Sequence, residues 1–266
     1  MSAVVQSNTE ALLLRHDAGG VASITLNRPK QYNALSEELL IELQATLDTI
    51  GSDDSVRVVV IAGSGSAFCA GHDLKQMRAN PDQAYYRKLF AQCSRMMMTV
   101  TQLPQPVIAR VHGIATAAGC QLVAQCDLAV ASTEARFAVS GINVGLFCST
   151  PSVSLGRNVS RKQAMEMLLT GEFIDAATAR ERGLVNRVVP ADKLDAEVKA
   201  LADAIIKKSS VAVTTGKKMF YKQMEMGMDA AYEYAAEIMA CNMMAQDAGE
   251  GIDAFMQKRP PQWKGK

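Results

Sequence analysis

The chain has 266 residues, of which 48% are hydrophobic and 21% charged, and its formal net charge is +1. This composition is typical of one large α/β domain or a domain with an appendage, and it is unlike that of a disordered chain. The small net charge argues against broad capture of nucleic acid or of an anionic membrane, because both need a concentrated basic surface. A small basic patch for one anionic ligand is compatible with it.

The chain shows no sign of secretion or membrane insertion. Its first ten residues, MSAVVQSNTE, have neither the basic and apolar regions of a signal peptide nor the Arg-rich pattern of a transit peptide. The six cysteines form no CxxC pair, and no apolar run approaches the roughly 20 residues of a spanning helix. We therefore expect reduced cysteines and a cytoplasmic protein.

Strand and helix signals alternate through the first half of the chain. Two apolar runs around Asp17-Ala18-Gly19-Gly20 predict a hairpin. Ser36, followed by Glu37 and Glu38, predicts the start of a helix that ends at Gly51. Further strands are expected at 56–62, 107–111, 128–131 and 137–139, and helices at 85–101 and 120–124, with small-residue loops at 63–73, 113–119 and 141–151.

Helix signals dominate the second half, and strand signals disappear after a run at 184–189. Many methionines lie in these later helices, which is more typical of packing surfaces than of a cofactor site. We expect a core at 1–205 and a helical region at 206–266 that makes subunit contacts. The expected helices lie at 161–169, 176–182, 193–208, 212–227 and 230–245.

Several common cofactor motifs are missing. Gly63-Ser64-Gly65 lacks the third glycine of a dinucleotide fingerprint, and no Walker lysine follows it. The three histidines are not at metal-ligand spacing, and no GxSxG nucleophile elbow occurs. The sequence predicts no metal site and gives nicotinamide or ATP poor support.

Two loops of very small residues share one pattern. The segments 68–74 (FCAGHDL) and 112–120 (HGIATAAGC) each follow an apolar strand and precede a helix. A helix N-terminus offers unpaired N–H groups that attract negative charge, and two such groups aimed at one point would hold an oxyanion. Small residues also serve tight strand–helix packing, so the pattern alone leaves both interpretations open.

A run of motifs in this order resembles the crotonase superfamily, the enoyl-CoA hydratase/isomerase family. The resemblance extends from about residue 10 to the C-terminus. The segments that carry it are NRPKQYNAL (27–35), FCAGHDLK (68–75), PVIA (106–109), AAGC (117–120), CDLAVA (126–131), AMEMLLTG (164–171) and the stretch 250–259.

The resemblance implies a spiral of ββα units at 1–205 that holds a coenzyme A thioester site. It implies a C-terminal all-helical trimerisation region at 206–266, and hence a homotrimer or homohexamer. Coenzyme A would enter as part of an acyl-CoA substrate, with no covalently bound cofactor. The oxyanion-hole N–H groups would be those of His72 and Ala118. The implied substrate contacts are Lys30, Ala34, Ala70, His72, Asp73, Leu74, Lys75 and Ala118, with Phe255 and Lys258 in reach of a neighbouring subunit.

The chain departs from the family pattern at the two catalytic positions. Family hydratases use two glutamates, and the matching positions here are Gln121 and Gly141. Neither side chain can exchange a proton, so classical hydration should be weak or absent. Restoring both glutamates should introduce some hydratase activity if the pocket geometry is intact. Substitute chemistry from Cys148, Ser149, Ser140, Asn143 or Asp127 has weaker support.

Three functions therefore stay open. The protein is an acyl-CoA lyase or isomerase with altered chemistry, a decarboxylase of malonyl-type thioesters, or a non-catalytic acyl-CoA binding or assembly protein. Decarboxylation would need only the oxyanion hole, because loss of CO₂ makes the enolate without a base. The histidine at position 72 resembles that of some decarboxylases in the family and could orient a carboxylate.

Overall fold

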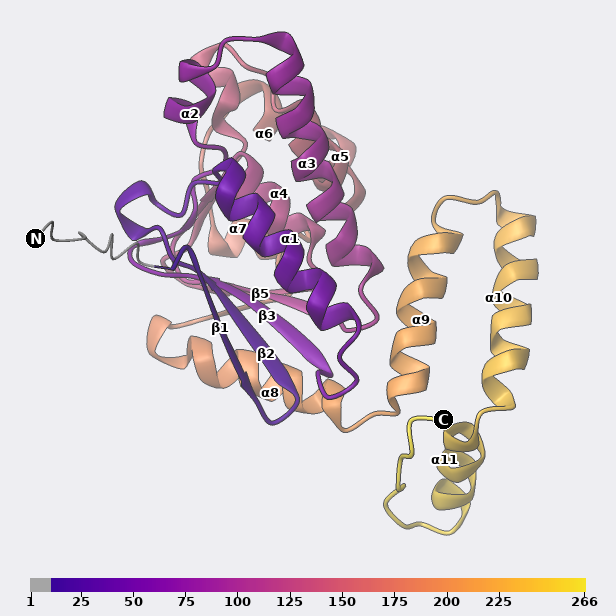
Figure 1. The fold of residues 1–266 in the computed structure, drawn as a ribbon. Coiled ribbons are helices and arrows are strands. Elements are labelled where there is room, and N and C mark those ends of the chain that lie inside the picture. The colour runs from indigo at the N-terminus through magenta and orange to yellow at the C-terminus, as the bar shows by residue number, and fades with distance from the viewer. Residues whose placement is uncertain (1–10) are drawn as a thin grey trace, which may run out of the picture.

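Two β-sheets form the centre of the computed structural model, which describes residues 11–266 (Figure 1). The larger sheet has the order β1-β2-β3-β5-β7-β10, and the smaller has the order β4-β6-β8-β9. The strands are β1 (Leu13–Ala18), β2 (Val21–Leu26), β3 (Val58–Gly63), β4 (Ala67–Cys69), β5 (Val107–Val111), β6 (Ile114–Thr116), β7 (Leu128–Ser132), β8 (Arg136–Ala138), β9 (Ile174–Asp175) and β10 (Arg187–Val189).

The chain distributes successive strands between the two sheets. In each of three units the first strand joins the large sheet and the second joins the small one, as with β3 then β4, β5 then β6, and β7 then β8. Equivalent strands pair in parallel, β3 with β5 and β5 with β7, and likewise β4 with β6 and β6 with β8. This repeated step is the spiral of ββα units that the sequence predicts, and the prediction is confirmed.

Helices cover both faces of the large sheet. Val59 and Ile61 of β3 pack into the core beneath α1 and α3, whereas Val58 and Val60 pack against α8 on the opposite face (Figure 1). A strand buried on both faces needs a nearly continuous apolar run, as found here.

The helices are η1 (Pro29–Gln31), α1 (Glu37–Gly51), α2 (Leu74–Ala79), α3 (Gln83–Gln102), α4 (Ala118–Gln125), η2 (Ser140–Val144), α5 (Ser149–Asn158), α6 (Arg161–Thr170), α7 (Ala176–Glu181), η3 (Ala191–Lys193), α8 (Leu194–Ile206), α9 (Ser210–Gln223), α10 (Met228–Met243) and α11 (Gln246–Met256).

Two of the expected loops contain strands that the sequence did not predict. Strands β4 and β6 have three residues each, too few to show a period of two. The six-residue helix α2 directly follows the first of these loops. The hairpin is also longer than expected, since β1 runs to Ala18 through Arg15, His16 and Asp17. Those polar residues are tolerated because β1 is an edge strand with an exposed face. Helices α5 and α11 were likewise not predicted at these bounds.

The last three helices stand away from the two sheets (Figure 1). They expose many large apolar side chains, which is unusual for surfaces that stay in water. None of the helices in residues 11–266 is long and apolar enough to cross a membrane. The exposed apolar residues of these helices are Phe220, Met224, Met228, Tyr232, Met239, Met243, Met244, Ile252, Phe255 and Met256.

A buried ion pair joins α9 to the core. The Asp127 carboxylate accepts hydrogen bonds from the Val107 backbone N–H (2.6 Å), from Lys217 Nζ (2.7 Å) and from the Tyr221 hydroxyl (2.8 Å). Burial lowers the pKa of the Lys217 ammonium, and the adjacent Asp127 opposes that shift. The Asp127 carboxylate therefore holds α9 in place through its hydrogen bonds to Lys217 and Tyr221. Asp127 does not line the cavity described below.

Replacing Asp127 should destabilise the fold strongly. Asp127→Ala leaves the Lys217 ammonium, whose side chain is 6% exposed, without its counter-charge. We expect a loss of about 3–5 kcal/mol in the free energy of unfolding, measured by urea denaturation. The matched control is Asp203→Ala, which breaks the exposed pair with Lys199 and should cost less than about 1 kcal/mol. Equal losses for both variants would contradict this role.

Candidate active site

The turn before α1 is organised by a buried asparagine. Asn33 is 0% exposed and has a φ of 56°, a left-handed conformation that asparagine adopts more readily than most residues. Its Oδ1 accepts from the Arg28 N–H at 2.9 Å, and its Nδ2 donates to the carbonyls of Ser64 and Ala67, both at 2.8 Å. Asn33 thus joins this turn to the segment that precedes β4.

Leu35 fixes the direction of the backbone around His72. The Leu35 N–H donates to the Gly71 carbonyl at 2.7 Å, and the Asp73 N–H donates to the Leu35 carbonyl at 3.2 Å. Leu35 and His72 form a parallel bridge. In such a bridge the residue between the two bonded groups turns its own N–H to the other side. The His72 N–H therefore points away from Leu35.

Asp73 secures the other end of this loop. It caps α2 by accepting from the Lys75 and Gln76 N–H groups at 3.1 and 3.2 Å, and it pairs with Arg28 at 2.9 Å. Burial disfavours the carboxylate, but the bonds from Arg28 and the two backbone N–H groups outweigh it and lower the pKa of Asp73. These contacts give Asp73 a role in fixing the loop and keep it ionised.

The start of α4 provides the second set of free amides. Ala117 has a φ of 51° and no side-chain cap, and its own N–H donates to the Ala138 carbonyl at 3.0 Å. The first N–H groups of a helix have no acceptor within the helix, so the Ala118 N–H is available to a ligand. A positive φ at an alanine is strained, and it sets the direction of that amide.

Glycines at 71 and 119 let the two segments touch. A Cβ at Gly71 would lie 2.8 Å from Ala117 Cβ and 3.1 Å from the Ala118 nitrogen, and a Cβ at Gly119 would lie 2.1 Å from the Cys69 carbonyl oxygen. The small residues therefore serve tight packing. The same packing sets the backbone at Gly71 directly beside the Ala118 amide.

A cavity of about 210 Å³ opens beside these amides. The two loops contribute Ala70, His72, Ala117 and Ala118 to its lining, and most of the other lining residues are apolar. Its lining residues are Ala70, His72, Leu74, Met77, Phe90, Ala117, Ala118, Ser140, Gly141, Val144, Leu146, Phe147, Cys148, Ser149, Thr150 and Pro151. The wall residues Met77, Phe90, Val144, Leu146 and Phe147 were not predicted from the sequence.

The His72 ring lies in this cavity as a neutral group. It packs edge-on against Phe90 with the ring centroids 5.4 Å apart, and its Nε2 is buried without a hydrogen-bond partner among residues 11–266. Burial lowers the pKa of His72 to about 4. At neutral pH the imidazole is therefore uncharged, and its free nitrogen can make one hydrogen bond to a ligand.

The two positions of the expected glutamate pair differ in their surroundings. Gln121 lies on α4 with 4% exposure, its Oε1 has no partner among the described residues, and it is not among the lining residues. Gly141 does line the cavity. A Cβ at Gly141 would meet the Leu146 carbonyl oxygen at 2.5 Å and Cys148 Sγ at 2.7 Å. A side chain at 141 therefore has no room in this backbone.

Cys148 gains no activation from its position before α5. Its Sγ accepts a hydrogen bond from the Gly141 N–H at 3.3 Å, but burial raises the pKa of the thiol. The neutral thiol therefore prevails at pH 7, and it is a poor nucleophile. The Ser140 hydroxyl is also engaged, because it shares a hydrogen bond of 2.7 Å with the Thr116 hydroxyl.

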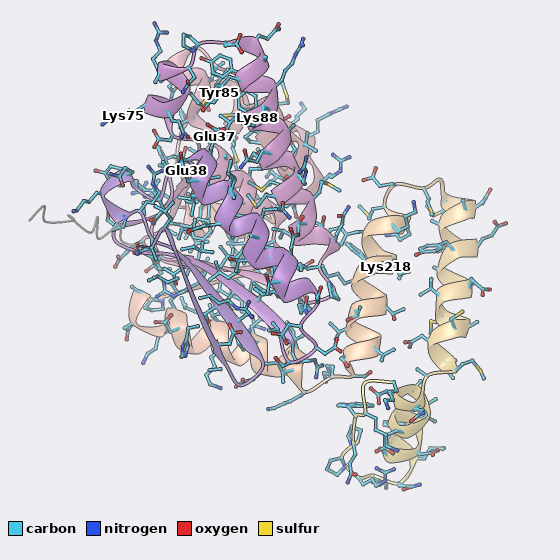
Figure 2. All side chains as sticks on the ribbon, in the orientation of Figure 1. Glu37, Glu38, Lys75, Tyr85, Lys88 and Lys218 are labelled. Atoms are coloured by element: carbon cyan, nitrogen blue, oxygen red, sulfur yellow. The ribbon has the colours of Figure 1, made fainter. Side chains whose placement is uncertain are left out.

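The expected coenzyme A contacts fall into two groups. Lys30 and Lys75 are exposed near the loops that form the cavity, and Ala34 is buried with its carbonyl bonded to Arg28 at 2.5 Å. Figure 2 shows Lys75 at the surface on α2. Phe255, 85% exposed, belongs to α11, and Lys258 follows that helix. Figure 1 shows α11 at the opposite end of the molecule from α2. A single chain does not bring these last two residues to the cavity.

The fold is that of a crotonase-type protein, and the chain belongs to the enoyl-CoA hydratase/isomerase family. The family model described as enoyl-CoA hydratase/isomerase matches residues 16–266.

Named relatives are similar over nearly the whole chain. The mitochondrial enoyl-CoA hydratase domain-containing protein 3 of Xenopus laevis is 46% identical over 92% of this chain and 83% of its own length. The crystal structure of human enoyl-CoA hydratase domain-containing protein 3 is 43% identical with a TM-score of 0.93, covering 95% of this chain and 100% of that one. An enoyl-CoA hydratase structure from Mycobacterium smegmatis is 58% identical with a TM-score of 0.94, covering 96% and 99%.

The vertebrate relatives carry a mitochondrial location in their names. That location is theirs, and the cytoplasmic location expected for this chain stays a prediction. The N-terminal pattern on which it rests falls in residues 1–10, outside the described residues.

Adding one methyl group at Gly71 should separate the two loops. Gly71→Ala and Gly145→Ala both place alanine at a positive φ, 90° and 78°, but a Cβ at Gly145 meets nothing within 4 Å. The shared conformational penalty is about 1–2 kcal/mol. We expect Gly71→Ala to lose a further 1–3 kcal/mol or so through overpacking, measured by urea unfolding. Identical losses would mean that the loops do not touch.

Proposed function

We propose that the protein binds an acyl-CoA thioester and stabilises its enolate between the backbone N–H groups of His72 and Ala118. The observation that carries the proposal is the close approach at Gly71, where a Cβ would lie 3.1 Å from the Ala118 nitrogen. The Leu35 bridge turns the His72 N–H away from the strand pairing. Two amides beside one cavity are the elements of an oxyanion hole.

The surroundings favour a thioester over a more polar ligand. The cavity opposite the amides is lined by Met77, Phe90 and Leu146, which suit an acyl group. Lys30 and Lys75 at the surface supply charge that matches phosphate. In an apolar cavity, donors directed at a developing negative charge are worth more than in water.

Proton transfer at the carbons next to the thioester lacks the two glutamates that family hydratases use. A positioned general acid or base supplies about 10²–10⁴ in rate, and Gln121 and Gly141 supply neither. The oxyanion hole alone stabilises an enolate by about 2.7–4 kcal/mol per donor. We therefore propose that classical hydration is weak or absent, while enolate stabilisation is retained.

Decarboxylation of a malonyl-type thioester is the second candidate. Cleavage of the carbon–carbon bond releases CO₂ and leaves its electron pair on the thioester as the enolate, so no base is required. The observation in its favour is that His72 lines the same cavity and that its buried Nε2 has no hydrogen-bond partner among residues 11–266. A neutral imidazole there can donate one hydrogen bond to a substrate carboxylate.

Assembly through the C-terminal helices is a further part of the proposal. The exposed apolar side chains of α9–α11 would be covered in a homotrimer or in a homohexamer of two trimers. In such an assembly, Phe255 and Lys258 would reach the acyl-CoA site of another copy of the chain. A non-catalytic acyl-CoA binding or assembly role is the outcome that remains if no turnover occurs.

Turnover of three thioesters separates these functions. Crotonyl-CoA, a 3-enoyl-CoA and methylmalonyl-CoA are incubated with the protein and the products followed by mass spectrometry. We expect hydration at least on the order of 10⁴ slower than that of a family hydratase with both carboxylates. Propionyl-CoA from methylmalonyl-CoA would establish the decarboxylase, and binding without turnover would establish the binder. Hydration at an ordinary hydratase rate would overturn the proposal.

Restoring the two glutamates tests the geometry at Gly141. The structure changes the expectation from sequence, because Leu146 and Cys148 fill the space that a side chain at 141 needs. Gln121→Glu/Gly141→Glu should hydrate crotonyl-CoA no faster than Gln121→Glu alone. Gly141→Ala should cost about 1–3 kcal/mol of stability, whereas the control Gly156→Ala, which meets nothing within 4 Å on α5, should not. Brisk hydration by a well-folded double variant would show that this loop adapts.

A further inference from the structure

The end of the chain folds back onto the junction between α8 and α9. Trp263 Nε1 donates to the Lys207 carbonyl at 2.8 Å. The Trp263 ring lies against Gly251 of α11, where a Cβ would meet a ring carbon at 3.1 Å. Figure 1 shows the C-terminus beside α11. We call residues 259–266 the C-terminal strap, because they connect α11 to the junction.

A buried carboxylate holds the end of this strap. Asp247, in the first turn of α11, is 3% exposed. Its oxygens accept from the Lys264 N–H at 2.7 Å, the Gly265 N–H at 3.1 Å and the Ser209 hydroxyl at 2.7 Å. Its own N–H donates to the Lys266 carbonyl at 3.0 Å. Asp247 therefore joins α11, the strap and the junction at one point.

The charge of Asp247 is maintained by these contacts. Burial disfavours the carboxylate, but the bonds from Ser209 and from the two strap N–H groups outweigh it and lower the pKa of Asp247. Hydrogen bonds to a charged acceptor are stronger than those to a neutral one. Ser209 is itself buried and caps α9 by accepting from the Ala212 N–H at 3.3 Å. The Asp247 carboxylate therefore fixes α11 to the start of α9.

The strap begins directly after the residues expected to contact coenzyme A. Lys258 has a φ of 54°, which turns the chain out of α11. Glu250 of α11 then accepts from both Arg259 nitrogens, at 2.6 and 2.8 Å, and from the Gln262 N–H at 2.7 Å. This pair is more exposed than Asp247 and contributes less. The position of Phe255 and Lys258 thus depends mainly on Asp247.

We propose that Asp247 is a positioning residue that, by holding the C-terminal strap, fixes α11 where Phe255 and Lys258 reach the acyl-CoA site of another copy of the chain. The inference rests on the proposed function and assembly, and it adds the residue on which that contact depends. Phe255 and Lys258 are both exposed and do not line the cavity of their own chain. They act on a ligand only if α11 is directed at a second copy.

The only tryptophan of the chain reports whether the strap is attached, because it is Trp263. Asp247→Ala should shift its emission to the red as the ring leaves Gly251. It should also weaken butyryl-CoA binding by about tenfold, as expected when a charge-assisted contact is lost. Calorimetry on the full-length protein measures the affinity. The matched control Asp253→Ala removes an exposed carboxylate from the same helix and should change neither quantity.

A second set of variants separates positioning from a general effect on the fold. Phe255→Ala/Lys258→Ala removes the contact itself and should lose about the same affinity. Adding Asp247→Ala to that variant should lower the affinity no further, because both changes remove one contact. Asp247→Asn fills the same space and keeps one acceptor oxygen, so it should recover part of the loss. It carries the test if circular dichroism shows that Asp247→Ala does not fold.

Two results would show that Asp247 does not position this contact. Losses that add up would mean that Asp247 affects binding by another route, and full affinity in Asp247→Ala would mean that the strap positions nothing. If Phe255→Ala/Lys258→Ala binds butyryl-CoA as tightly as the wild type, the contact between copies is absent. The inference then fails, while the proposal for the cavity stands. If the wild-type protein binds no acyl-CoA, the proposed function itself fails.

Discussion

The close approach of two backbone segments, Gly71–His72 and Ala117–Ala118, is the constraint on which the site depends. The small sheet creates it, because β4 delivers the first segment and β6 delivers the second, and these strands pair directly in that sheet. Glycine at 71 leaves out the Cβ that would lie 2.8 Å from the Ala117 Cβ and 3.1 Å from the Ala118 nitrogen. Asn33 and Leu35 then hold the first segment from outside the sheet. The arrangement is thus set by main-chain geometry, and side-chain hydrogen bonds such as those of Asn33 hold it in place.

A site built from amides has a characteristic chemistry. Amide N–H groups stabilise negative charge at any pH at which the protein is folded, but they cannot accept a proton. The side chains around them share this limit, because burial keeps His72 and Cys148 uncharged at neutral pH. Asp73 is ionised, yet Arg28 and the start of α2 occupy its oxygens. The cavity therefore combines strong anion stabilisation with little acid–base capacity, and the proposed enolate chemistry fits that combination.

The sequence predicted the parts of the molecule whose signals are local. The buried strand at 58–63 and helix α1 with Ser36 at its start are examples, since runs of apolar residues and caps are visible in a few residues. The strands β4 and β6 were missed because three residues carry no measurable period. The amides at 72 and 118 were expected from the family resemblance, but the reason for their proximity, the contact at Gly71, is not local. The cavity walls at Met77 and Leu146 were missed for the same reason, since α2 and the segment after η2 meet only in the fold.

Likeness in sequence and fold is a weak guide to the reaction at this site. The Mycobacterium smegmatis structure is named an enoyl-CoA hydratase and superposes with a TM-score of 0.94, yet such a score is set by the positions of all backbone atoms. The reaction depends on two positions. At Gly141 the difference is deeper than a missing side chain, because the Leu146 carbonyl and the Cys148 sulfur occupy the space a carboxylate stem would need. The loop from 141 to 148 has the shape that suits a glycine, so the lack of a carboxylate there is fixed by the backbone. The same loop contributes Val144 and Leu146 to the lining of the cavity. A backbone that excludes the second carboxylate and lines an apolar cavity fits the proposal that the protein polarises a thioester carbonyl without adding water to it.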